Sequence, residues 1–142
     1  MADPNLRALT SLGRLRHVET DGARRDLGDA LAKETALAAR DEAIEREMDA
    51  ARWVSGNFDR EAFSAWFGRM QTERVLLADA MRDAKALTAA ARTALAHRRV
   101  AETSAEEELA RQVSAREVEL ERRDQLTLED VARALKLGRL ST

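Results

Sequence analysis

Apolar residues in this chain recur at alternating intervals of three and four on both sides of one strong turn signal. The first run comprises Ala23, Leu27, Ala30, Leu37, Ile44, Met48 and Ala51. The second run comprises Phe63, Trp66, Met70, Leu77, Ala84, Leu87, Ala91 and Ala94. This alternation is typical of a coiled-coil seam. Between the runs, Ser55-Gly56-Asn57 tolerates the backbone angles of a turn. The sequence therefore predicts an all-α fold, a long antiparallel two-helix coiled-coil hairpin with a short helix or turn at its tip.

Helix-end signals give the expected boundaries. Asp3 can cap the first helix, and Pro4 suits its first position. Lys136 followed by Gly138 is an ordinary helix stop. We expect one domain over residues 1–142, with arm one over about 4–54, the tip over about 55–70 and arm two over about 71–137.

Three positions leave details of the helices open. Asn57 or Asp59 can cap the second helix, and Gly68 indicates a kink near its beginning. A separate short helix over residues 59–69, folded as part of the tip, would reduce the difference in length between the two arms. Ser104 and Glu107 have the spacing of a capping box, but no Gly or Pro lies there, which favours an uninterrupted helix. The first seam is imperfect, because Glu34 and Asp41 fall on it.

The start of the chain carries a second apolar pattern. It consists of Leu6, Leu9, Leu12, Leu15 and Val18, spaced three residues apart. At about 100° per residue, this spacing drifts by roughly 60° at each step, so the stripe winds around the helix. One partner helix cannot cover all of it. The stripe either packs on the longer second arm or offers a surface to another protein.

Composition narrows the class of protein. Charged residues make up 35% of the chain with a net charge of −2, which gives no basic excess for nucleic acid. An apolar content of 44% with a helical period argues against disorder. There is no cysteine and no apolar run of the ~20 residues that span a bilayer, and arginines interrupt the N-terminal segment. We expect a soluble, cytoplasmic protein.

The sequence contains no recognisable catalytic or cofactor pattern. The six glycines are scattered singly, so no phosphate-binding loop is present. His17 and His97 lie among arginines without a ligand-spaced cluster, and the carboxylates have the spacing of a solvated helix surface. We therefore expect no enzyme activity, no cofactor and no metal.

The residues Glu121-Arg122-Arg123-Asp124-Gln125-Leu126-Thr127-Leu128-Glu129-Asp130-Val131-Ala132 resemble the C-terminal signature of the FliJ/YscO family. These proteins are small coiled-coil stalks of flagellar and virulence type III export. The N-terminal Leu9-x-x-Leu12-x-x-Leu15-Arg16 and the group Phe63-x-x-Trp66-Phe67 are also similar to the family.

The resemblance implies a set of partners and contact residues. The paired ends of the hairpin would enter the ring of the export ATPase FliI and promote its assembly and turnover. The tip would face the export gate FlhA at the inner membrane, and export chaperones are further possible partners. The implied ring contacts are Leu6, Leu9, Leu12, Arg14, Arg16, Arg122, Arg123, Gln125, Leu128, Val131 and Leu135. The implied gate or tip contacts are Met48, Phe63, Trp66, Phe67 and Met70.

Each implied contact also has a structural explanation. The aromatic group can plug the tip, the methionines can fill the seam, and Arg122-Arg123 can be a solvated face. Two other functions compete with the stalk. One is an export chaperone that holds unfolded substrates, and the other is a generic coiled-coil scaffold that dimerises. The sequence leaves the oligomeric state open.

Overall fold

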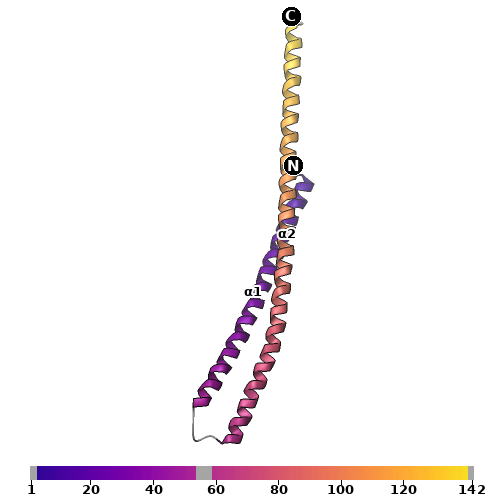
Figure 1. Cartoon of the computed structure of the whole chain (residues 1–142). Helices are drawn as coiled ribbons and strands as arrows, with labels where there is room; N and C mark the ends of the chain where they lie inside the picture. The colour runs from indigo at the N-terminus through magenta and orange to yellow at the C-terminus, as the bar shows by residue number, and fades with distance from the viewer. Residues whose placement is uncertain (1–2, 54–58, 141–142) are drawn as a thin grey trace. The chain divides into compact units, whose positions relative to one another are not determined.

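The computed structural model describes residues 3–53 and 59–140 of the chain (Figure 1). It contains two helices, α1 from Pro4 to Trp53 and α2 from Arg60 to Leu140. Side chains early in α1 pair with side chains late in α2, so the two helices run antiparallel. The fold is therefore all-α, a coiled-coil-like helical hairpin, and this prediction is confirmed.

The hairpin divides into two compact units. Unit 1 combines Met1–Val18 with Val100–Thr142, and unit 2 is Glu19–Arg99. The sequence led us to expect one domain over residues 1–142. A seam between two helices has no common centre, because each layer of side chains contacts only the adjacent layers. Contacts therefore group along the chain.

Carboxylates cap the start of both helices. The Asp3 Oδ1 accepts a hydrogen bond from the backbone N–H of Asn5 at 2.9 Å, and α1 begins at Pro4 as predicted. The Asp59 Oδ1 accepts from the backbone N–H of Glu61 at 3.0 Å. Of the two candidate caps of the second helix, Asp59 is therefore the one that the structure shows.

α2 is one continuous helix, which differs from the prediction of a separate short helix at the tip. Because α2 is continuous from Arg60, residues 60–69 are its first turns, and the separate short helix over 59–69 is wrong. One helical glycine costs only ~1 kcal/mol relative to Ala, too little for Gly68 to break a helix that packs on both sides of it. The helix also runs through Thr103 and Ser104, which confirms the uninterrupted alternative, and it passes Gly138 to end at Leu140. The predicted turn at 55–57 lies outside the described residues.

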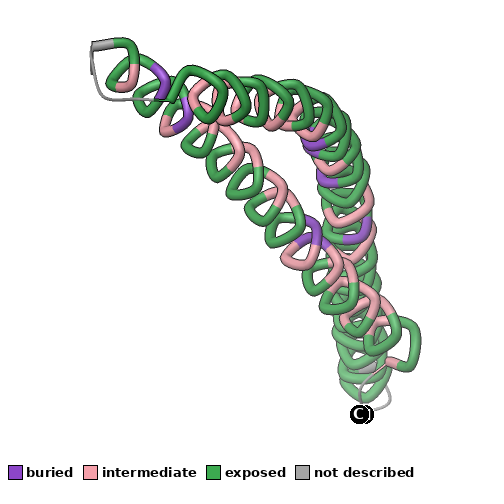
Figure 2. Tube along the Cα trace, turned by 90° about the horizontal axis from the view of Figure 1, so that it is seen from below, coloured by how far each residue is buried: buried purple, intermediate pink, exposed green. Residues whose placement is uncertain are grey.

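The core of unit 2 is a narrow seam. Its most buried side chains, purple in Figure 2, are Thr20, Ala23, Ile44, Met48, Ala84, Thr88 and Leu95. The predicted run on α1 is confirmed at Ala23, Ile44 and Met48, and its other members are half-buried. On α2 the predicted Leu87 and Ala94 are wrong, since both are exposed while Thr88 and Leu95 are buried. After Ala84 the next buried residue of the seam is four positions on, at Thr88, and not three positions on, at Leu87. A threonine hydroxyl is therefore buried in the seam.

Polar groups on the seam have partners on the opposite helix. The Thr88 hydroxyl lies 2.6 Å from Glu34 Oε2, and Arg74 donates from Nε to Asp41 Oδ1 at 3.1 Å. The hydrogen bond and the charge of Asp41 raise the pKa of Arg74, so this guanidinium stays protonated. Glu34 and Asp41 were predicted to interrupt the seam, and each has a hydrogen-bond partner on the opposite helix. Polar pairs of this kind favour one register, because a shifted pairing leaves them without partners.

Replacing Thr88 with Val should lower the free energy of unfolding by about 1–2 kcal/mol, because Glu34 loses its hydroxyl donor. Adding Glu34→Leu should recover most of this loss, since removal of both polar partners is nearly neutral. Urea denaturation followed by circular dichroism measures both effects. Thr93→Val is the matched control, because Thr93 is exposed and bonds only the carbonyl of its own helix. Equal losses in Thr88→Val and the control would contradict the seam register.

Candidate protein-binding surfaces

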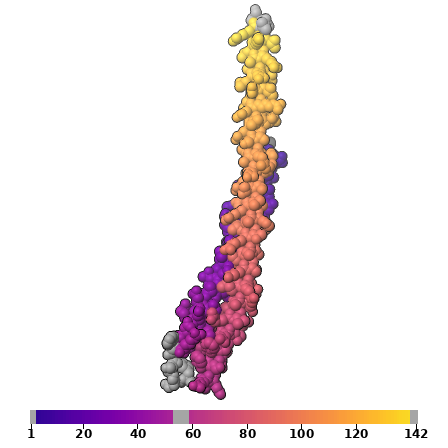
Figure 3. All heavy atoms as spheres, in the orientation of Figure 1, coloured from indigo at the N-terminus to yellow at the C-terminus, as the bar shows by residue number. Residues whose placement is uncertain are grey.

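Within the described part of unit 1, the end of α2 has no partner helix along it. We call residues 117–139 the α2 extension. The last ion pair between the helices of unit 1 that the structure gives joins Asp3 Oδ2 to Arg116 Nη1 at 3.0 Å. Every residue from 111 to 139 is exposed, and in Figure 3 no other part of unit 1 covers the yellow end of α2. The extension therefore presents its whole circumference to solvent.

Large apolar side chains are exposed on this extension. They are Val118, Leu120, Leu126, Leu128, Val131, Leu135 and Leu137, with exposed fractions from 47% to 69%. At about 100° per residue, Leu120, Leu128, Val131 and Leu135 fall within roughly 80° of one another around the helix. Leu128, Val131 and Leu135 form one apolar face, and Asp124 lies between this face and Leu120. Exposed apolar surface of this kind is typical of protein interaction sites.

The predicted ring contacts near the end of α2 all lie in the extension. Leu128, Val131 and Leu135 are among its most exposed apolar side chains, at 69%, 51% and 64%. Arg122 and Arg123 approach Glu119 at 4.0 Å and 3.4 Å on the same helix. Both arginines keep about 70% of their side-chain surface exposed, so these local pairs leave them accessible.

The leucine stripe at the start of α1 divides into two parts. Leu6, Leu9 and Leu12 are half-buried, whereas Leu15 and Val18 are 53% and 60% exposed. The stripe therefore winds around α1 as its spacing of three predicts. Its first three leucines are half-buried, and its last two apolar residues are exposed to solvent. Packing on arm two explains three of the five residues of the stripe and leaves the other two available to a partner.

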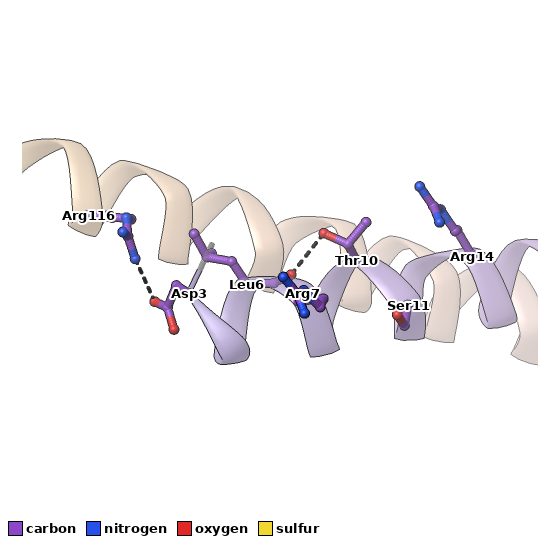
Figure 4. A pocket seen from close by; sticks show the side chains of 7 residues that line it. All are labelled: Asp3, Leu6, Arg7, Thr10, Ser11, Arg14 and Arg116. Atoms are coloured by element: carbon purple, nitrogen blue, oxygen red, sulfur yellow. Dashed lines mark hydrogen bonds and ion pairs between the residues drawn. The ribbon is translucent and has the colours of Figure 1, made fainter. Parts of the chain in front are cut away.

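A shallow groove opens between the two helices of unit 1, as Figure 4 shows. Leu6 points towards α2 in it, and the Thr10 hydroxyl donates to the Leu6 carbonyl at 2.8 Å. Its lining residues are Asp3, Leu6, Arg7, Thr10, Ser11, Arg14 and Arg116. Of the predicted ring contacts on α1, Leu6 and Arg14 lie in this groove, and Arg16 is half-buried nearby on α1.

Charged pairs hold the rest of unit 1. His17 Nδ1 lies 2.8 Å from Glu102 Oε1 on the opposite helix. On α2, Arg111 donates to Glu108 Oε2 from Nη2 at 2.7 Å and from Nε at 3.1 Å, and Gln112 donates to Glu108 Oε1 at 3.0 Å. These hydrogen bonds lower the pKa of Glu108, which stays ionised to a lower pH than a free glutamate. Among the described residues of unit 1, Ala105 alone is buried, so the unit is held by charged pairs and by half-buried side chains such as Leu6, Leu9 and Leu12.

Four of the five predicted gate contacts lie near the start of α2, namely Phe63, Trp66, Phe67 and Met70, and the fifth, Met48, lies on α1. Phe63 lies 5.9 Å from Trp66 and 6.0 Å from Phe67, measured between ring centroids. Phe63 and Trp66 line a small apolar groove with Ala51 and Ala62. Met48 is only 4% exposed, so it fills the seam and has little surface for a partner. Phe58 and the side chain of Trp53 lie outside the described residues.

Trp66→Ala tests whether the aromatic group plugs the tip. Trp66 is half-buried beside Phe63, so its loss should lower the free energy of unfolding by about 1–2 kcal/mol. Thermal melting monitors this, with exposed Arg69→Ala as a control that should change stability by less than about 0.5 kcal/mol. A melting temperature unchanged by Trp66→Ala would rule out the plug and leave a docking surface.

Residues 3–53 and 59–140 contain no group of three metal-ligating side chains. Within the same ranges, neither helix has an apolar stretch that could cross a membrane. Comparison of the chain with protein-family models, curated proteins and solved structures gave no match.

Sequence reasoning did not select Val118, Leu126 or Leu137 as contacts. They lie off the face that carries Leu128 and Val131, and they become candidates only because no helix covers the extension. No spacing signal could have identified them.

Proposed function

We propose that this chain is a non-enzymatic coiled-coil stalk of the flagellar type III protein export apparatus. In this role it binds the export ATPase ring FliI, raises the rate of ATP hydrolysis, and links the ring to the export gate FlhA. It acts in the cytoplasm at the cytoplasmic face of the inner membrane, which it reaches only through its partners.

One observation supports this proposal most directly. The segment Glu121–Ala132, which resembles the FliJ/YscO signature, lies entirely in the α2 extension. Its Leu128 and Val131 are exposed on a helix that has no partner along it in unit 1. A signature that served only to close the hairpin would be expected at the seam, where its apolar residues would be buried.

The mechanism in this role is binding. ATPase subunits that assemble as a ring around the extension would bury the side chains of its apolar face. Separate subunits would not gain this burial energy. The stalk would thereby favour the assembled ring, which is the active form. Arg122 and Arg123 would add polar contacts at the rim of this surface.

Steady-state ATP hydrolysis by FliI, titrated with this chain, tests the proposal. Saturable stimulation, together with a larger ATPase species in sedimentation, is the expected result. A flat titration with a helical, monodisperse sample would overturn the ATPase role. Binding to unfolded flagellar subunits without an effect on hydrolysis would instead favour an export chaperone.

A further inference from the structure

One exposed side of α1 in unit 1 carries a ridge with two arginines. Its members recur at intervals of four, three and four, and at about 100° per residue they fall within roughly 60° of one another. They are Arg7, Ser11, Arg14 and Val18, and all four are exposed. Residues 4–18 contain no Asp or Glu, and among the described residues neither arginine has an ion-pair partner within 4.0 Å. We call these four residues the basic ridge.

The α2 extension carries a stripe of opposite charge with the same spacing. Its members are Glu117, Glu121, Asp124 and Leu128, and they also fall within roughly 60° of one another. All four are exposed, and in the described part of the chain none of the three carboxylates has an ion-pair partner within 4.0 Å. We call these residues the acidic stripe.

The ion pairs of the extension lie on its other side. Glu119 Oε2 approaches Arg122 Nη1 at 4.0 Å, and Glu119 Oε1 approaches Arg123 Nε at 3.4 Å. Asp130 Oδ1 approaches Arg133 Nη1 at 4.0 Å. These five residues lie at least roughly 100° around the helix from every member of the acidic stripe. Charges of both signs therefore pair locally on one side of the extension, and the other side presents carboxylates of one sign followed by a leucine.

The basic ridge and the acidic stripe do not come together within one chain. The ion pair of Asp3 with Arg116 fixes the register of unit 1, and in that register Arg14 lies level with residue 105. Asp124 lies about 19 residues further along α2, which is roughly 28 Å at 1.5 Å per residue. A partner for either surface must therefore come from another molecule.

We propose that two copies of this chain form a reversible dimer in which the basic ridge of each copy packs on the acidic stripe of the other. When ridge and stripe run in the same direction, each arginine faces a carboxylate and Val18 faces Leu128. In the opposite direction, Arg7 would face Leu128, and Val18 would face Glu117. Charge complementarity therefore selects the parallel contact.

The parallel contact closes into a symmetric dimer. Because α1 and α2 are antiparallel within each copy, an extension that lies parallel to α1 of the other copy is antiparallel to the α2 of that copy. The same two-fold operation places the second extension on the first α1, with the axis near Ser114 and Ala115 of α2. Two identical contacts form at once, so no contact of this kind remains open for a third copy.

The dimer does not depend on the proposed function, because it forms from the chain alone. It covers Arg14 and Leu128, two residues that the proposed function assigns to the ATPase ring. The ring and the second copy would therefore compete, and dilution would release the monomer by mass action. A chain that stimulates the ATPase but never dimerises would refute only the dimer. A dimer whose monomer leaves hydrolysis unchanged would refute only the proposed function.

Sedimentation velocity of the full chain, from about 1 to about 200 μM at low salt, is the first test. Exposed ion pairs contribute little each, so we expect mostly monomer at the lowest concentration and mostly dimer at the highest. The association should weaken as salt screens the charges. A monomer at every concentration would overturn the proposal.

Charge reversal tests the contact residues. Arg7→Glu with Arg14→Glu, and separately Glu117→Lys with Asp124→Lys, should each raise the Kd of the dimer at least about tenfold. An equimolar mixture of the two variants should associate again, because each reversed surface then faces one of opposite charge. All four positions are exposed, so circular dichroism should remain unchanged. Failure of the mixture to associate would contradict the proposed contact.

Glu119→Lys with Asp130→Lys is the matched control. It makes the same change of net charge as the variant of the acidic stripe, but on the other side of the extension. Its Kd should stay within about twofold of that of the natural chain. An equal loss of association in the control would indicate a general effect of charge and overturn the proposal.

Disulfide crosslinking tests the orientation, and the natural chain has no cysteine to interfere. Val18→Cys mixed with Leu128→Cys should form a disulfide between the two variants on oxidation, because these residues face each other in the parallel contact. Val18→Cys mixed with Glu117→Cys should not, since Glu117 lies about 11 residues, or roughly 16 Å, from Leu128 along the helix. Crosslinking through position 117 equal to that through position 128 would overturn the parallel arrangement.

Discussion

Ile44→Ala should destabilise the hairpin more than any other single truncation in unit 2. Ile44 is fully buried and is the largest side chain in the seam with no exposed surface. Removing buried methylene and methyl groups loses their transfer energy and leaves a cavity, at a cost of about 2–5 kcal/mol for Ile→Ala. Two helices can close part of the gap by moving together, so we expect a loss of about 2–3 kcal/mol in the free energy of unfolding.

Urea denaturation monitored by far-ultraviolet circular dichroism measures this loss. Leu76→Ala provides the matched control, since Leu76 is an aliphatic residue of similar size but 62% exposed. We expect the control to change stability by less than about 0.5 kcal/mol. Similar losses at the two positions would show that the seam does not run through Ile44 in solution.

Leu128→Asp combined with Val131→Asp should abolish stimulation of the export ATPase while the chain stays folded. Both side chains are more than half exposed and lie on the apolar face of the α2 extension. Two carboxylates at the centre of that face would have to be desolvated on binding, which costs several kcal/mol per ion and removes the apolar burial as well. The hairpin seam is elsewhere, so helicity and the urea midpoint should remain unchanged.

The matched control is Val75→Asp with Leu76→Asp. These residues are each 62% exposed, they add the same charge, and they lie in unit 2. The control protein should stimulate hydrolysis as the natural chain does. Full stimulation by Leu128→Asp with Val131→Asp would move the contact away from the extension. Loss of stimulation in both variants would indicate a general effect of negative charge.

Apolar periodicity identified buried residues of the seam correctly on α1 but not throughout α2. On α1 the predicted Ala23, Ile44 and Met48 are buried, because intervals of three and four repeat there with few competing apolar residues. On α2 both Leu87 and Thr88 satisfy the repeat, and hydrophobicity favours leucine. The structure buries Thr88 instead, where its hydroxyl has two acceptors, Glu34 on the opposite helix and the Ala84 carbonyl on its own helix. A single helix cannot reveal that choice.

The sequence by itself determined the helical class, the antiparallel hairpin and the cap at Asp3, because these depend on local propensity and on apolar spacing within each helix. It also showed which stretch of α2 resembles an export stalk. Only the tertiary structure decided that α2 continues unbroken from Arg60, that the seam passes through Thr88 and Leu95, and that residues 117–139 are exposed along their whole length. The physical reason is that register and exposure are properties of two helices together. Each depends on where the side chains of the opposite helix lie, and the spacing of apolar residues along one helix does not specify those positions.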